Sequence, residues 1–180
     1  YSREEDNPMD ARIRILRPED VSEDYGSWLE DPEVNRYLEC RRRAFSLDDL
    51  RAYVRAMNES PKDVLFGIFL SGENRHIGNI KIGNIDAIHR YADIGLLIGA
   101  KDVWGKGYGS IAIDLAAQYA FRQLNLHKVV AGIHDGNTGS VKAFLKAGFR
   151  ECGRLTQHRF CDGSYVDEIL VERSREPCEQ

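Results

Sequence analysis

Three glycines stand at every second position in "DVWGKGYGSIAIDLAAQYAF", residues 102–121, directly before an alanine-rich apolar pattern of helical period. Gly105, Gly107 and Gly109 would let the backbone turn several N–H groups toward one point. A helix that begins there adds four unpaired N–H groups and the positive end of its dipole. These residues therefore predict an anion site, most naturally for a diphosphate. The alternative is a tight connection between a strand and a helix that binds nothing.

Two common phosphate loops do not fit this stretch. The dinucleotide fingerprint requires a third glycine one place later, where Ser110 stands. The P-loop requires Ser or Thr after its Gly-Lys pair, whereas Gly107 follows Lys106. If the stretch binds phosphate, it does so as a loop of another kind.

The length, net charge and apolar content of the chain limit the classes of function that it can have. The chain has 180 residues, enough for one domain with its own core, and carries a net charge of -4. That charge gives no electrostatic case for general nucleic-acid binding. No segment reaches the roughly 18 apolar residues of a membrane span, and the start has no signal-peptide core. We therefore expect a cytoplasmic monomer or homodimer, with neither a nucleic acid nor a membrane as partner.

The cysteines and the two ends of the chain complete this outline. The four cysteines form no CxxC pair and have no histidines at metal-finger spacing, so we expect reduced thiols and no metal site. They are Cys40, Cys152, Cys161 and Cys178. We expect residues 1–10 to be a polar tail, native or an expression remnant, before a domain over 11–173 and a C-terminal tail over 174–180.

The periodicity of apolar residues predicts an ordered mixture of strands and helices. Expected strands are 12–16, 64–70, 76–82, 91–99, 127–134 and two more that flank 161–164. Expected helices are 18–29, opened by its proline, a short one over 32–39, 47–58, one from the glycines to about Asn125, and 138–147. Ser46 and Asp49 resemble a capping box, and Gly148 stands at a C-cap position. Early hairpins and one late strand-helix-strand crossover predict a single α+β or mixed-sheet α/β domain.

One strand after the glycines comes a second motif, "HDGNTGSVKAFLKAGF". With both motifs in this order, the chain resembles the GNAT superfamily of N-acetyltransferases, especially the branch of ribosomal-protein N-terminal acetyltransferases and related small-molecule enzymes. The family's pyrophosphate loop falls on residues 104–109. Its second signature falls on Asn137, Ser140, Phe144, Gly148 and Phe149. The resemblance runs from about Ala11 to Glu172 and implies a GNAT-like α/β fold, with a central mixed, mostly antiparallel sheet flanked by helices.

The resemblance also implies acetyl-CoA as cofactor and a set of residues that hold it. Asn137 would bond the pantetheine arm while capping a helix, and Ser140 would either bond the cofactor thiol or satisfy a first-turn N–H. A main-chain N–H near Leu97 or Ile98 would stabilise the oxyanion. The full cofactor-binding set is Leu97, Ile98, Trp104, Gly105, Lys106, Gly107, Tyr108, Gly109, Ser110, Asn137 and Ser140.

The sequence departs from the family pattern at two positions. Trp104 replaces the usual Gln or Arg at the head of the loop, which matters less because main-chain N–H groups bind the phosphate. Phe144 stands where many members carry a tyrosine that protonates the departing thiolate. A thiol has a reference pKa of about 8.5, so its anion is a tolerable leaving group near neutrality. The missing hydroxyl therefore does not forbid turnover.

The acceptor amine must lose a proton before it attacks, so a base is needed. Asp93 is the first candidate, because this branch often carries an acidic residue there, facing the acceptor; the alternative is a strand-edge charge or an ion-pair partner. His134 ends the next expected strand and could titrate near neutrality, although a strand-end histidine is more often packed or solvated. His89 and Glu39 are weaker candidates.

The identity of the acceptor is what the sequence indicates least clearly. Arginines cluster at Arg36, Arg41, Arg42 and Arg43, between the acidic residues Asp31, Glu33 and Glu39. If the arginines line the acceptor cleft they suit a phosphate-bearing acceptor; otherwise they form a solvated basic loop. An acidic cleft would instead suit a polycationic aminoglycoside or a peptide amine.

We therefore predict direct acetyl transfer from acetyl-CoA to a small-molecule primary amine, with an amino sugar or nucleotide-linked amino sugar as the leading acceptor. The alternatives are N-terminal acetylation of a protein and a non-catalytic acyl-CoA-binding module.

Overall fold

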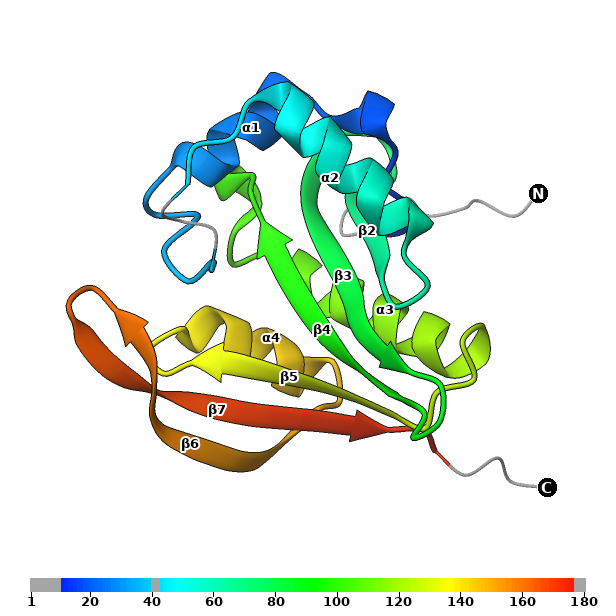
Figure 1. Cartoon of the computed structure of the whole chain (residues 1–180), viewed down its shortest axis with the longest axis vertical. Coiled ribbons are helices and arrows are strands. Elements are labelled where there is room, and N and C mark those ends of the chain that lie inside the picture. Colours follow the sequence, from blue (N-terminus) through cyan, green and yellow to red (C-terminus); the bar gives the residue numbers. More distant parts are fainter. Residues whose placement is uncertain (1–10, 40–42, 177–180) are drawn as a thin grey trace, which may run out of the picture.

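One sheet organises the computed structural model, which describes residues 11–39 and 43–176. The described residues form seven strands in the order β1-β2-β3-β4-β5-β7-β6 (Figure 1). They are β1 Ala11–Ile15, β2 Val64–Leu70, β3 His76–Asp86, β4 Tyr91–Ile98, β5 Lys128–His134, β6 Arg150–Cys161 and β7 Ser164–Ser174. Every neighbouring pair is antiparallel except β4 and β5, which are parallel. The predicted mixed, mostly antiparallel sheet is confirmed.

Helices cover both faces of this sheet (Figure 1). They are the 3-10 helix η1 Pro18–Asp20, α1 Glu23–Glu30, α2 Leu47–Glu59, the 3-10 helix η2 Lys101–Val103, α3 Tyr108–Arg122 and α4 Thr138–Lys146. On one face α3 packs against β1, β3, β4 and β5 and contacts α4, while α2 packs against β2 and contacts α1 on the other. Ser46 and Asp49 form the predicted capping box at the start of α2.

The parallel pair β4 and β5 separates partway along its length, and we call this separation the splay. Pairing runs only from Tyr91 and Lys128 to Asp93 and Val130. Beyond that point the two strands diverge, so the sheet opens like a V between β4 and β5 (Figure 1). The crossover through α3 connects the two strands, and the glycine stretch therefore lies at the open end of the V.

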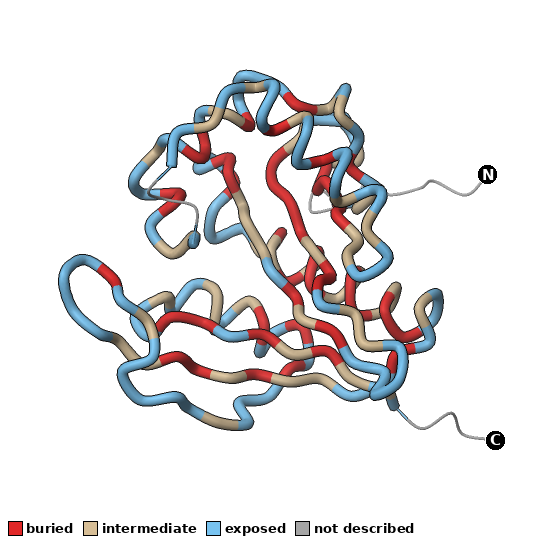
Figure 2. Tube along the Cα trace, in the orientation of Figure 1, coloured by how far each residue is buried: buried red, intermediate tan, exposed pale blue. Residues whose placement is uncertain are grey.

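Buried residues run along the interior strands and the helix faces that meet them (Figure 2), and most of these residues are apolar. Fully buried side chains on the strands include Ile68, Ile80, Ile82 and Val129. The four alanines of α3 at 112, 116, 117 and 120 are also fully buried. Small side chains let this helix lie close against the sheet, which fixes where its N-terminus points.

The predicted helix over 18–29 is wrong as a single element. The chain forms η1, leaves helical geometry at Val21 and Ser22, and restarts as α1. The carboxylate of Asp20 accepts hydrogen bonds from the Arg17 N–H at 2.8 Å and from the Arg14 guanidinium at 2.7 Å. Ser22 then caps α1 by accepting from the Tyr25 N–H. Local side-chain bonds thus compete with a continuous helix.

Two further boundaries differ from the prediction. Residues 32–39 form turns rather than a helix, because the Asn35 amide donates to the Leu29 carbonyl at 2.7 Å and pulls the chain back toward α1. Helix α3 ends at Arg122 instead of near Asn125, whose φ of 51° lies in the left-handed region. Neither change displaces the glycine stretch.

Within residues 11–39 and 43–176, no helix has the length and apolar run that a membrane span requires. Cys152 and Cys161 are free thiols, whereas Cys40 and Cys178 lie outside the described residues, as do residues 1–10. In the same described ranges no cluster of His, Cys, Asp or Glu could hold a metal ion.

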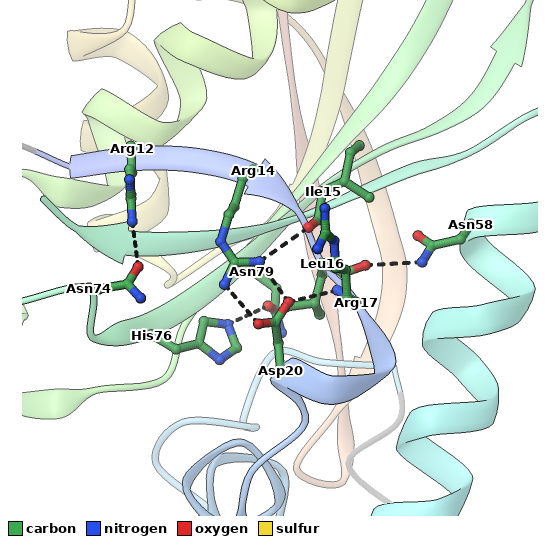
Figure 3. Close-up of polar contacts among 10 residues, drawn as sticks. All are labelled: Arg12, Arg14, Ile15, Leu16, Arg17, Asp20, Asn58, Asn74, His76 and Asn79. Atoms are coloured by element: carbon green, nitrogen blue, oxygen red, sulfur yellow. Dashed lines mark hydrogen bonds and ion pairs between the residues drawn. The ribbon is translucent and has the colours of Figure 1, made fainter.

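A partly buried polar cluster lies where β1 and η1 approach β3 (Figure 3). Arg14 forms two hydrogen bonds with Asp20, each 2.7 Å long, and the Arg14 guanidinium lies 3.9 Å from the Phe69 ring centroid. The His76 ring stacks on Phe69 and meets Trp28 edge-on, and its Nε2 lies 2.9 Å from Asn79 Oδ1. Burial lowers the pKa of His76 below its ordinary value of 6.5, more than the bond to Asn79 raises it.

This lowered pKa predicts a pH dependence of stability. Below the ordinary histidine pKa the unfolded chain binds a proton that folded His76 resists, so stability falls as the pH drops from 7.5 to 5.5. We expect His76→Phe, which keeps the ring packing on Phe69, to reduce this fall in melting temperature. His89→Gln is the control, because His89 is exposed in the β3–β4 turn. Equal slopes for wild type and His76→Phe would contradict the prediction.

Candidate functional site

The glycine loop has the backbone that an anion site requires. Gly105 and Gly107 adopt φ of 74° and 89°, in the left-handed region that favours glycine. Gly107 is the N-cap of α3 and, as a glycine, has no side chain with which to cap the helix. The first-turn N–H groups of a 15-residue helix therefore point out of the loop. The helix dipole adds a positive partial charge at the same place.

The side chains around this loop leave its main chain accessible. Ser110 Oγ donates to the Gly107 carbonyl at 2.8 Å, and the Tyr108 side chain is buried. Lys106 is exposed. The Lys146 ammonium of α4 lies 3.6 Å from the position that a Cβ on Gly107 would take. The Lys146 ammonium thus adds a positive charge beside the loop to the positive end of the helix dipole.

Trp104 has a structural role at the end of β4. Its indole Nε1 donates to the Ile98 carbonyl at 2.9 Å. Because N–H and C=O of one residue in a strand point to the same side, the Ile98 N–H also points away from β3 and toward the splay. The Gly99 N–H bonds Ile77 of β3, which agrees with this alternation and turns the Leu97 N–H toward β3. Of the two predicted oxyanion donors, the geometry favours Ile98.

The second motif forms the start of α4. Asn137 is the N-cap and its Oδ1 accepts from the Ser140 N–H at 3.2 Å, so its capping role is present. Ser140 is half-buried in the first turn. Phe144 is 2% exposed and packs edge-to-face on Phe149 with ring centroids 5.0 Å apart. The position at which the resemblance implies a tyrosine is therefore an apolar packing position here.

The face of β4 and β5 opposite α3 carries both predicted bases. Asp93 occupies the last paired position before the splay and accepts from Asn84 Nδ2 at 2.7 Å. By the two-residue alternation of a strand, Gly95 lies on the same face, as do Gly132 and His134 of β5. Gly95 has open space where a side chain would be. Gly95 therefore leaves a bare floor at the splay between Asp93 and His134, whereas the Glu168 carboxylate of β7 lies over Gly132.

His134 is buried at the end of β5. Its Nε2 lies 3.8 Å from Glu39 Oε1, and its ring meets the Tyr37 ring edge-to-face at 5.7 Å between centroids. Both neighbours come from the segment after α1. His89, by contrast, lies in the β3–β4 turn at the closed end of the V, away from the splay.

The structure also places a carboxylate here that sequence reasoning missed. Glu168 of β7 is 3% exposed and pairs in register with His134. Arg159 of β6 donates to Glu168 Oε1 from Nη2 at 2.6 Å and from Nε at 3.0 Å, and reaches Glu39 at 2.9 Å. The ion pair with Glu168 raises the pKa of Arg159 above its ordinary value. No local pattern marks Glu168, since its face of β7 mixes the apolar Val166 and Leu170 with the charged Glu172.

Of the predicted arginine cluster, the structure describes Arg36 and Arg43. Arg36 lies 3.5 Å from Asp162 and over the Tyr37 ring. Arg43 lies over Phe45, and Arg41 and Arg42 lie outside the described residues. The two described arginines already have carboxylate or aromatic neighbours. They give no separate support to a phosphate-bearing acceptor.

Comparison with known proteins gives one family. A family model described as an acetyltransferase (GNAT) domain matches residues 11–150. The uncharacterized N-acetyltransferase p20 of Bacillus licheniformis is 28% identical over 143 residues, which cover 78% of this chain and 79% of that protein. A spermidine N(1)-acetyltransferase of Vibrio cholerae is 35% identical over 91 residues, about half of each chain at 51% and 52%.

A solved structure is similar over nearly the whole length. The crystal structure of spermidine N-acetyltransferase from Vibrio cholerae, in complex with CoA and spermine, superposes with a TM-score of 0.81. It is 25% identical in sequence, and the match covers 91% of this chain and 95% of that one.

Proposed function

Because this chain belongs to the GNAT acetyltransferase family, we propose that it transfers the acetyl group of acetyl-CoA directly to a primary amine of a small polycationic molecule, of the polyamine class. The observation that carries the choice of acceptor is the set of carboxylates around the splay, Asp93, Glu39 and Glu168. Relatives that act on spermidine support the same choice.

The fit to acetyl-CoA rests on the glycine loop. Two left-handed glycines, a helix start whose N-cap is a glycine and the Lys146 ammonium offer backbone donors and positive charge to a pyrophosphate. Acetyl-CoA supplies a thioester whose carbonyl carbon is attacked by an amine and whose thiolate leaves. In the proposed arrangement Asn137 and Ser140 contact the pantetheine arm at the start of α4. The splay provides the passage between β4 and β5.

The remaining chemistry is assigned to the main chain and to the face opposite α3. The Ile98 N–H, which points into the splay, donates a hydrogen bond to the developing oxyanion. Phe144 has no proton to give, so coenzyme A leaves as a thiolate, which its reference pKa of about 8.5 makes tolerable. Holding amine and thioester together supplies much of the remaining rate enhancement.

Two groups on this face can take the proton of the acceptor amine. Asp93 lies at the base of the splay and is held by Asn84, and we assign it as the base that acts through a water. His134 lies at the other end of the glycine floor, where Glu39 stands 3.8 Å from its Nε2. We assign His134 to the acceptor's entry side, where it contacts the amine before transfer.

Asp93→Asn tests the first assignment. We expect acetyl-CoA affinity to stay nearly unchanged, because Asp93 lies outside the glycine loop, while kcat falls and its rise with pH becomes flatter. Asparagine keeps the shape and the bond to Asn84 but cannot accept a proton. The measurement is kcat against pH together with calorimetric binding of acetyl-CoA. Unchanged kinetics would remove Asp93 from the mechanism.

An acceptor panel tests the substrate class. Thiol release from acetyl-CoA would be followed with spermidine, an amino sugar, a nucleotide-linked amino sugar, an aminoglycoside and a short peptide. We expect the highest kcat/KM with the polyamine and a decrease at high salt, because the attraction is between exposed and partly buried charges. A higher kcat/KM for the nucleotide-linked amino sugar would restore the acceptor predicted from the arginines.

A further inference from the structure

A single arginine of β7 bridges the two helices that begin at the proposed cofactor site. Arg173 Nη1 donates to Asp114 Oδ1 of α3 at 2.7 Å and to the carbonyl of Ala147, the C-cap of α4, at 2.8 Å. One guanidinium nitrogen carries two N–H groups, so it can serve both acceptors. A cation at the C-terminus of α4 also complements the negative end of that helix dipole. Charge therefore joins the two helices in addition to their direct contact.

The side chain of Arg173 is packed between the same two helices. Its guanidinium carbon lies 5.9 Å from the ring centroid of Phe121, two turns after Asp114 on α3. On the other side, a Cβ on Gly148 would lie 3.6 Å from Arg173 Nε. The side chain is 23% exposed, so these neighbours hold most of it. Arg173 is thus fixed at the junction of α3 and α4.

This junction borders the glycine loop. Lys146, the last residue of α4, directly precedes Ala147, and its ammonium lies 3.6 Å from the position of a Cβ on Gly107. A Cβ on Gly109 would lie 3.6 Å from the Cβ of Ala143, one turn earlier in α4. The last turn of α4 therefore flanks the loop at two of its glycines. Where this turn lies decides where the Lys146 ammonium can reach.

A fixed helix end matters for a lysine in particular. Its ammonium sits on a flexible four-carbon stem, so the position of the charge is set mainly by the backbone that carries it. A charge that is already near its partner costs less ordering when the partner binds. The bridge through Arg173 thus prepares a cation for the anion that the loop binds.

We propose that Arg173 is a positioning residue for acetyl-CoA: by bridging α3 and α4 it holds the Lys146 ammonium beside the glycine loop, where Lys146 pairs with the pyrophosphate. This inference rests on the proposed binding of acetyl-CoA at that loop.

Arg173→Met tests it, since methionine keeps an unbranched side chain against Phe121 and Gly148 but donates no hydrogen bond. We expect the Kd for acetyl-CoA to rise by a factor of about 5, the scale of one partly exposed ion pair. The KM for acetyl-CoA should rise with it, while kcat at saturation changes little. The difference from the wild type should shrink as salt is added, because the lost contact is between charges. Unchanged affinity in calorimetric titration would overturn the inference.

A double-mutant cycle separates positioning from a general loosening of the fold. If Arg173 acts through Lys146, Lys146→Met weakens acetyl-CoA binding by itself, and adding Arg173→Met causes no further loss. Two independent structural effects would instead give losses that multiply. Multiplied losses in the double variant would overturn the inference, as would full affinity in Lys146→Met.

Glu172→Gln is the matched control. Glu172 is the neighbour of Arg173 on β7 and has an ion pair of the same length, 2.7 Å to Lys128 Nζ. By strand alternation its side chain lies on the opposite face, away from α3 and α4. We expect its acetyl-CoA affinity to match the wild type. A loss equal to that of Arg173→Met would mean that any broken ion pair on β7 suffices, which would overturn the inference.

A second variant covers the case in which Arg173→Met fails to fold. Asp114→Ala breaks the bridge from the side of α3, where the Asp114 side chain is 40% exposed and alanine favours the helix. We expect the same rise in Kd for acetyl-CoA, and an unchanged Kd would overturn the inference. Absence of acetyl-CoA binding in the wild type would instead refute the proposed cofactor site, so the two failures are distinguishable.

Discussion

Gly107→Val is expected to weaken acetyl-CoA binding at least about tenfold. Gly107 has φ of 89°, and a left-handed conformation costs a residue with a Cβ about 1–2 kcal/mol, more for a β-branched one. The variant must either bear this strain or turn its N–H groups away from the pyrophosphate, and its side chain would also point at the Lys146 ammonium. Calorimetric titration with acetyl-CoA measures the change.

Gly72→Val is the control for this substitution. Gly72 lies in the turn after β2, has no positive φ and has no atom within 4 Å of its Cβ position. We expect its acetyl-CoA affinity to equal that of the wild type. Retained affinity in Gly107→Val would show that the phosphate site lies elsewhere.

Gly95→Val is expected to lower kcat/KM for the amine by a factor of about 100, the loss that a displaced reactant can cause. The fold should remain intact, because a Cβ at this position meets nothing and valine favours strands. Its branched side chain would nevertheless cover the floor between Asp93 and His134. Acetyl-CoA affinity should change little, since the glycine loop is untouched.

Gly153→Val provides the comparison for Gly95→Val. Gly153 lies on β6, where a Cβ would make ordinary contact with Leu170 at 3.6 Å. Its kinetics should match those of the wild type. Normal turnover in Gly95→Val would mean that the reacting amine does not approach over this face.

Much of the fold was predictable from the sequence, because its signals are local. The strands follow apolar runs and alternation, and the capping box at Ser46 marks the start of α2 by itself. The glycine stretch predicted a loop that turns its N–H groups toward one point before α3, and there Gly105 and Gly107 adopt the left-handed conformation. The family resemblance rested on these same local motifs and is confirmed by the family model.

The errors arose where a side chain competes locally with the helical backbone. Asp20 bonds Arg14 and the Arg17 N–H, and this interrupts a run that reads as one helix. Asn35 bonds the Leu29 carbonyl and converts a helical pattern into turns. Each competing bond depends on the neighbouring fold, so periodicity alone does not reveal it.

The wall of the site depends on contacts between distant parts of the chain. Arg159 and Glu39 are 120 residues apart, and Glu168 reaches the splay only because Gly132 lies beneath it. Glutamate is mostly found at exposed positions, so the residue type of Glu168 gives no sign that the folded chain buries it. The position of Trp104 was recognised, but its bond to the Ile98 carbonyl follows from how β4 ends.

The central claim is direct transfer of an acetyl group from acetyl-CoA to a polycationic amine. The most direct test is to incubate the protein with acetyl-CoA and spermidine, and to measure free thiol and the mass of the amine in the same samples. The account predicts one added acetyl group on spermidine for each thiol released. Binding of acetyl-CoA with no thiol released for any amine would contradict it and leave a non-catalytic acyl-CoA-binding module.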